Sequence, residues 1–169
     1  AEPDGSKIYY DEITERIAKQ GVFVNYNLGG TSHRKLMLES KRDSEGLTAD
    51  EQTQLDGVLS QLESDHVFHP RMRSQGVTIV CGSDSAWGPY KMGQFHYEVE
   101  AHVDAGMAPM EALVAATSDA ARSCMVDHEV GSLEVGKQGD VLVVVGDPTK
   151  DITAIRNVAA VFKGGQRVR

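Results

Sequence analysis

The feature that most constrains the fold is a short apolar run, Val77–Cys81, with a glycine on either side. Most of its residues are β-branched, and it has no alternating polar face. Such runs are typical of a strand buried on both faces of a parallel sheet. A second β-prone run, Val22–Tyr26, lies upstream, and a long helical segment separates the two. Because strands that alternate with helices favour a parallel sheet, we expect an α/β fold.

Capping and periodicity predict the helices. Thr48 and Glu51 match a capping box, in which each side chain accepts a hydrogen bond from the other residue's backbone amide. The apolar residues that follow repeat at helical spacing, which predicts a helix from Thr48 towards Arg73, with Pro70 as a kink or an end. The charged stretch 33–44 predicts no clear element. Three further ranges are predicted to be helical: Ile8–Gln20, Phe95–Ala105 and Pro109–Met125.

The C-terminal stretch is predicted to be a small β unit. Asp140–Val145 indicates a strand, and Val158–Phe162 and Gln166–Arg169 flank a glycine-rich turn that is typical of a hairpin. The two upstream strands cannot cover their own edges. They therefore indicate part of a larger sheet, with the β unit in a second layer or subdomain.

Composition excludes some partners. The formal net charge of -8 disfavours nucleic acid and anionic membranes, and no apolar run approaches the ~20 residues that span a bilayer. Lacking a signal-peptide pattern, the chain is expected to be cytoplasmic. Because Ala1 rather than Met comes first, we expect that processing or truncation removed an upstream segment. Cys81 and Cys124 are expected to be buried free thiols.

Asp84 is the sharpest candidate for chemistry. It follows the buried run, where α/β folds and barrels place catalytic groups. A carboxylate there could bind a metal or act as a general base, but Asp is also a common helix cap. The residues alone leave the two interpretations equally open.

Other candidates carry weaker signals. Trp87 and Tyr90, just past Asp84, are interpreted as pocket walls in preference to loop packing. Asn25 and Asn27, at the end of the upstream strand, could bind substrate or form a turn. Among the histidines, His66 and His69 predict a solvated helix end rather than a metal pair, and His96 and His102 a helix surface.

Several motifs in order resemble the amidohydrolase superfamily. The segment ending in Gly-Ser-Asp at Asp84 resembles its eighth barrel strand, and Asp104–Leu113 with Ala115–Thr117 resembles the helix after it. Gly131–Lys137 and Asp140–Val144 resemble the return to its C-terminal β domain. The imidazolonepropionase-like and prolidase-like branch is the most similar.

The resemblance implies a fold and an activity. The fold would be the C-terminal portion of a TIM (β/α)8 barrel, strands seven and eight, plus part of a small β-sandwich. Residues 1–126 would form the partial barrel, and 127–169 the strands of the β domain. The activity would be hydrolysis of a carbon–nitrogen bond in a small molecule, a cyclic amide, amidine or N-acyl amino acid, by metal-activated water. Asp84 would bind zinc or another divalent metal and take the proton.

The sequence departs from the family in its metal ligands. The His-x-His motif is absent, and none of the histidines ends a predicted strand. A catalytic zinc needs about three protein ligands, so the chain alone is expected to be inactive and not to bind the metal fully. Its expected partner is a missing N-terminal half of the barrel, although an uncovered strand edge also favours a homo-oligomer. The alternative is a noncatalytic structural or interaction fragment that needs that half.

Overall fold

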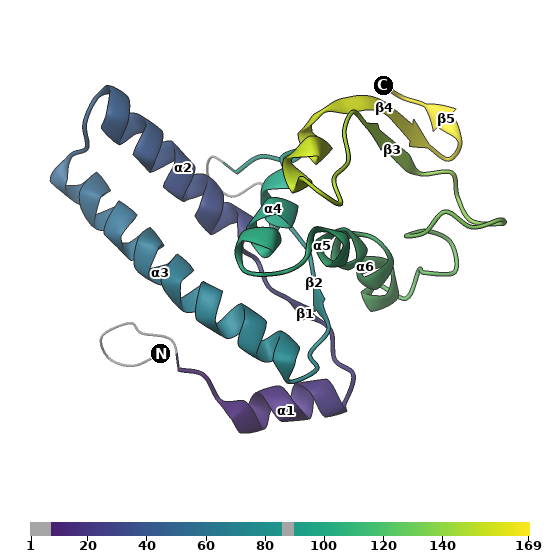
Figure 1. Cartoon of the computed structure of the whole chain (residues 1–169), viewed down its shortest axis with the longest axis horizontal. Helices are drawn as coiled ribbons and strands as arrows, with labels where there is room; N and C mark the ends of the chain where they lie inside the picture. Colours follow the sequence, from purple (N-terminus) through teal and green to yellow (C-terminus); the bar gives the residue numbers. More distant parts are fainter. Residues whose placement is uncertain (1–7, 86–89) are drawn as a thin grey trace.

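The structure is a computed structural model that describes residues 8–85 and 90–169 (Figure 1). Its helices are α1 (Asp11–Lys19), α2 (Gly29–Ser44), α3 (Ala49–Ser74), α4 (His96–Asp104), α5 (Pro109–Ala116), α6 (Ser118–Ser123) and the 3-10 helix η1 (Ile152–Arg156). Its strands are β1 (Val24–Asn25), β2 (Ile79–Val80), β3 (Val141–Val144), β4 (Val158–Lys163) and β5 (Gln166–Arg167).

The strands β1 and β2 form a parallel pair, as predicted. Val24 lies opposite Ile79 and Asn25 opposite Val80, and the Val24 amide donates to the Thr78 carbonyl over 3.0 Å. The regular pairing is shorter than the apolar runs suggested. In the described ranges, neither strand has a second strand neighbour, so each has one edge without a strand beside it.

The connection from β1 to β2 is a long antiparallel pair of helices, α2 and α3 (Figure 1). Stretch 33–44 lies within α2, which the sequence did not predict because its charged residues mask the periodicity. The capping box at the start of α3 is confirmed: the Thr48 amide donates to Glu51 Oε2 over 3.0 Å, and the Glu51 amide to Thr48 Oγ1 over 3.3 Å. Helix α3 continues through Pro70 to Ser74, since buried Asp65 and His69 anchor the turns around Pro70 in the core.

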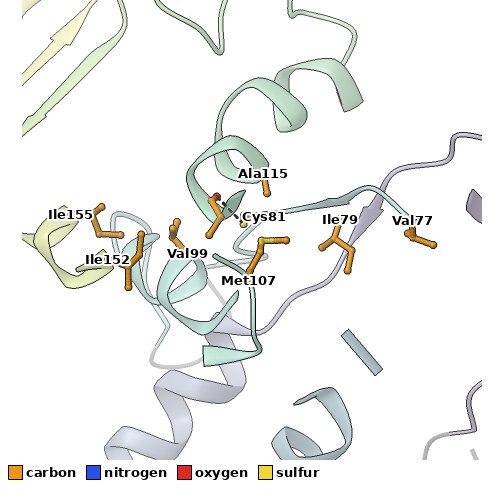
Figure 2. Close-up of a cluster of buried hydrophobic side chains, with 9 residues drawn as sticks. Val77, Ile79, Cys81, Val99, Met107, Ala115, Ile152 and Ile155 are labelled. Carbon is orange, nitrogen blue, oxygen red and sulfur yellow. Dashed lines mark hydrogen bonds between the residues drawn. The ribbon is translucent and has the colours of Figure 1, made fainter. Parts of the chain in front are cut away.

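The core lies between β2 and the helices that follow it (Figure 2). The Cys81 thiol donates to the Ala112 carbonyl over 3.8 Å, and the Cys81 amide to the Ala115 carbonyl over 3.2 Å, so β2 is tied to α5. The rest of the cluster includes apolar side chains from α4, from the α4–α5 loop and from η1: Val99, Met107, Ile152 and Ile155. The division of the chain near residue 126 stays a prediction, and residues on both sides of it share this core.

Two expectations for the segment after α4 were wrong. A single helix over 109–125 is instead two, α5 and α6, which meet at Thr117, where φ is -126° and ψ is -88°. The Thr117 hydroxyl donates to the Leu113 carbonyl, and Gly131 packs so closely on this break that a Cβ would lie 3.1 Å from the Thr117 carbonyl. Because α6 ends at Ser123, Cys124 lies outside the core and is exposed, whereas Cys81 is buried as expected.

The C-terminal strands form a separate antiparallel sheet in the order β3-β4-β5. Leu142 lies opposite Val161, and the register shifts between Val143 and Val144. This sheet and the α2–α3 pair lie at opposite ends of the molecule (Figure 1). The predicted separation into two sheets is therefore confirmed. In the described ranges we find no helix with both the length and the apolar character to cross a bilayer.

Candidate functional site

A cleft of about 490 Å³ lies where the chain leaves β1 and β2. One wall follows the two strands, another is the start of α2, and a third is a face of α3. The described residues that line it are Asn27, Gly30, Thr31, Arg34, Gln54, Gly57, Val58, Gln61, Ser83, Asp84 and Tyr90.

Asp84 lies on the C-terminal side of β2 and lines this cleft, as expected for a catalytic carboxylate. Its backbone has a positive φ of 42°, a conformation that Asp tolerates better than most residues. The side chain is exposed. The helix-cap interpretation does not hold, because the next described helix, α4, begins only at His96 and has Phe95 at its N-cap.

The weaker candidates divide into two groups. Asn27 and Tyr90 line the cleft with Asp84. The Asn25 side chain lies against the backbone of Gly82: a Cβ added to Gly82 would lie 2.6 Å from Asn25 Nδ2. Asn25 is not part of the cleft lining. Trp87 lies outside the described residues.

Tyr90 is the most unusual residue of the lining. It is 5% exposed, and its hydroxyl has no hydrogen-bond partner among the residues that the structure describes. Burial, and then the charge of Glu98, raise the pKa of Tyr90 to about 12. The phenol therefore stays protonated at neutral pH and keeps its hydrogen-bond donor.

Behind the cleft lies a buried polar chain that the sequence did not predict. His69 Nε2 lies 2.9 Å from His102 Nδ1, and His102 Nε2 lies 3.0 Å from Glu98 Oε1. All three side chains are 0% exposed. The expectation of a solvated His69 and a surface His102 was therefore wrong. Residue spacing along one helix cannot reveal the pairing, because the two histidines come from different helices, α3 and α4.

Glu98 fixes the start of α2. Its Oε1 and Oε2 accept hydrogen bonds from the Leu28 and Gly29 amides over 3.0 and 2.6 Å. A negative charge at a helix N-terminus is favourable because the free amides there point towards it. Gly29 is needed at this contact, since a Cβ would lie 2.8 Å from Glu98 Cα. The polar chain thus positions the α2 wall of the cleft.

A second polar contact supports the α3 wall. Asp65 is 1% exposed, and its two oxygens accept from the Tyr26 hydroxyl and from Gln61 Nε2, each over 2.7 Å. Burial and the hydrogen bond to Asp65 raise the pKa of Tyr26. Gln61 lines the cleft, so this pair holds one of its polar side chains in place.

The described residues do not form a complete metal site. Within 8–85 and 90–169, no three His, Cys, Asp or Glu side chains are grouped so that they could hold an ion. Asp84 is the single acidic residue in the described lining of the cleft. A catalytic metal needs about three protein ligands, so Asp84 could serve as one ligand but does not constitute a site.

Comparison with known proteins gives the family. The Amidohydrolase family model matches residues 11–168, nearly the whole chain. The chain belongs to the amidohydrolase family. The resemblance to this family is thereby confirmed.

Curated amidohydrolase relatives match a part of the chain. Imidazolonepropionase of Symbiobacterium thermophilum is 41% identical over 80 residues, which are 47% of this chain and 19% of that protein. Ochratoxinase of Aspergillus niger is 35% identical over 95 residues, 54% of this chain and 19% of the relative. These matches span about a fifth of the length of the relatives.

Solved amidohydrolase structures match almost the whole chain. A Xaa-Pro dipeptidase with bound methionine superposes with a TM-score of 0.70 at 22% identity, over 95% of this chain and 37% of its own. The A. niger ochratoxinase structure has a TM-score of 0.65 at 28% identity and covers 95% of this chain and 35% of its own. The fold described above therefore corresponds to a little over a third of these larger structures.

Sequence reasoning missed Arg34, Thr31 and Gln61 in the cleft. The pair Gly29-Gly30, which follows Asn27 and Leu28, is the signal that could have indicated the start of α2 as a wall of the cleft, because adjacent glycines near a strand exit permit close backbone approach.

Proposed function

We propose that this chain contributes Asp84 and part of the substrate cleft to a larger hydrolase that cleaves a carbon–nitrogen bond in a small molecule. A cyclic amide, an amidine and an N-acyl amino acid are the substrate classes that we favour. In this proposal β1 and β2 are the seventh and eighth strands of a (β/α)8 barrel, and β3–β5 belong to a small β-sandwich. The observation that supports it most is the position of Asp84, at the exit of a parallel strand and in a cleft.

The names of the matched proteins support the reaction class. One solved structure with a TM-score of 0.70 is a phenylurea hydrolase and another is a dipeptidase. Ureas and dipeptides both contain a carbonyl carbon bound to nitrogen. The amidohydrolase family supports hydrolysis in general, and the choice among substrates is our proposal.

Asp84 would act on water in the cleft. Its carboxylate accepts a proton as the water oxygen attacks the carbonyl or amidine carbon. The carbon–nitrogen bond then breaks, and the leaving nitrogen takes up the proton. Asn27 and Tyr90 could orient the substrate by hydrogen bonds. A divalent metal such as zinc, which the family resemblance implies, would need ligands from outside the described residues, so we derive no step through it.

The N-terminal half of the barrel is the partner that the proposal requires. It would supply the remaining barrel strands and the other metal ligands. The 169-residue chain on its own should therefore lack hydrolase activity and a tight metal site.

The test is activity by complementation. The purified chain is measured for bound zinc and for turnover of an amide panel, alone and mixed with an N-terminal amidohydrolase half supplied as a second chain. We expect turnover only in the mixture, lost in Asp84→Asn because an amide cannot accept the water's proton, and retained in Asp127→Asn, an exposed acid outside the cleft lining. Stoichiometric zinc and turnover by the chain alone would contradict the proposal. A folded mixture without turnover would favour the noncatalytic alternative.

A further inference from the structure

We propose that the start of α2, together with Arg34 and Tyr90, forms a subsite that binds a carboxylate and so selects acidic substrates. The inference deepens the proposed function, because it assigns the chemical class of molecule that the cleft binds, but its test needs no turnover.

The first observation is the charge of Arg34. It is exposed in the cleft, and it is the single basic residue in the described lining. Two other basic residues of α2 have partners: Lys41 pairs with Glu51 over 2.5 Å, and Arg42 with Asp43 over 3.0 Å. Arg34 has no ion pair within the described residues. Lys35 has no ion pair in the described part of the chain either, but it does not line the cleft. A planar guanidinium that is free to donate two parallel hydrogen bonds matches the geometry of a carboxylate.

The second observation is the set of backbone amides at the helix start. The first amides of an α-helix have no acceptor within the helix. The first turn of α2 has no acidic residue and no side-chain cap. Glu98 accepts from the Leu28 and Gly29 amides, but those of Gly30 and Thr31 have no acceptor among the described residues. Both of these residues line the cleft, where their amides attract negative charge.

The third observation is independent of the helix and points to a ligand. Tyr90 is 5% exposed, and within 8–85 and 90–169 its hydroxyl has no partner. Its ring packs on the helix start: a Cβ on Gly30 would lie 3.6 Å from Tyr90 Cδ1. The His33 ring, 5.7 Å away between centroids, helps to hold this orientation. A buried donor without an acceptor is costly, and a carboxylate oxygen is an acceptor that would remove this cost.

The balance of charge favours a monoanion. The described lining holds one cation, Arg34, and one anion, Asp84, and the buried carboxylate of Glu98 lies at the helix start next to it. A carboxylate can be matched by the one guanidinium, two amides and one phenol. A phosphate dianion would carry twice the charge against the same single cation and would be repelled by Asp84.

The test compares two probes that differ at one group, the anionic N-benzoylglycine and its neutral amide, N-benzoylglycinamide. Binding to the 169-residue chain is followed by NMR shifts of the Gly30 and Thr31 amides. We expect the acid to bind more tightly than the amide. Arg34→Met should weaken acid binding about 3- to 10-fold, the low end for a charge-assisted contact at an exposed site, and leave amide binding unchanged. Lys35→Met removes the same charge one residue along and outside the lining, and should bind like the wild type.

Further outcomes decide the inference. Tyr90→Phe should also weaken acid binding while the chain stays folded by circular dichroism. Equal affinities for the two probes, an equal loss in Lys35→Met, or no shift with the acid at its solubility limit would overturn the subsite. Loss of turnover in the complementation assay with preserved acid preference would overturn the proposed function and leave the subsite intact. Turnover without a preference for the acid would overturn the subsite and leave the proposed function intact.

Discussion

Acid should destabilise the fold through His69. The buried environment of this ring, and then the neighbouring His102, lower its pKa from 6.5 to about 4. The folded state therefore binds a proton less readily than the unfolded chain. The stability that depends on neutral His69 is fully present above pH 6.5 and is lost as the pH falls towards 4.

The size of the effect follows from the two pKa values. At 1.36 kcal/mol for each pH unit between 6.5 and about 4, protonation of this single site costs roughly 3 kcal/mol of unfolding free energy. Because a domain is stable by only about 5–15 kcal/mol, this loss is a large share of the total. The side chain is 0% exposed, so solvent does not screen the effect.

The assay is urea unfolding of the 169-residue chain, followed by circular dichroism at a series of pH values from 7 to 4. His69→Gln should be less stable than the wild type at pH 7, because it disturbs the contact with His102, yet it should lose about 3 kcal/mol less on acidification. His66→Gln, which changes an exposed histidine on the same helix, should follow the wild type. Parallel curves for the wild type and His69→Gln would refute this account of the buried chain.

Three further substitutions test the packing by thermal or urea unfolding. Tyr90→Phe should raise the free energy of unfolding by about 1 kcal/mol, since it removes a buried hydroxyl that has no partner in the described part of the chain; a lower free energy of unfolding would show that the hydroxyl has an acceptor. Gly29→Ala should cost about 1–3 kcal/mol, because the new Cβ would lie 2.6 Å from Glu98 Oε2. In its control, Gly57→Ala in α3, the new Cβ meets no atom within 4 Å, and the free energy of unfolding should rise by up to about 1 kcal/mol from helix propensity. Equal changes in the free energy of unfolding for the two variants would show that the contact with Glu98 does not cause the loss. Thr48→Ala should cost about 1 kcal/mol by removing the capping box, and unchanged stability would show that the cap contributes nothing.

Local signals predicted the framework of this fold. The parallel strands came from the run of β-branched residues, and the start of α3 came from Thr48 and Glu51, because both depend on neighbours in the sequence. Asp84 could be placed at a strand exit for the same reason. Its helix-cap alternative was resolved only by the position of α4, which begins well downstream.

Long-range contacts were beyond the sequence. His69 and His102 lie 33 residues apart and meet because two helices pack together. Helical spacing places Glu98 four residues before His102, but such a pair is also typical of an exposed helix face, so it does not identify a buried chain that spans two helices. Arg34 was missed because α2 carries charges on most of its turns, and only the position of the helix start marks one of them as part of a cleft.

The α2–α3 pair also has a consequence for how related chains of this family could differ. Its base is anchored by Glu98 and Asp65, while its tip, at 45–48, is an exposed turn. The helices extend roughly 24 and 39 Å at ~1.5 Å per residue. Insertions or deletions of whole helical turns near the tip would leave the strands and Asp84 undisturbed. The length of this helix pair could therefore change among related proteins while the cleft at its base keeps the same residues.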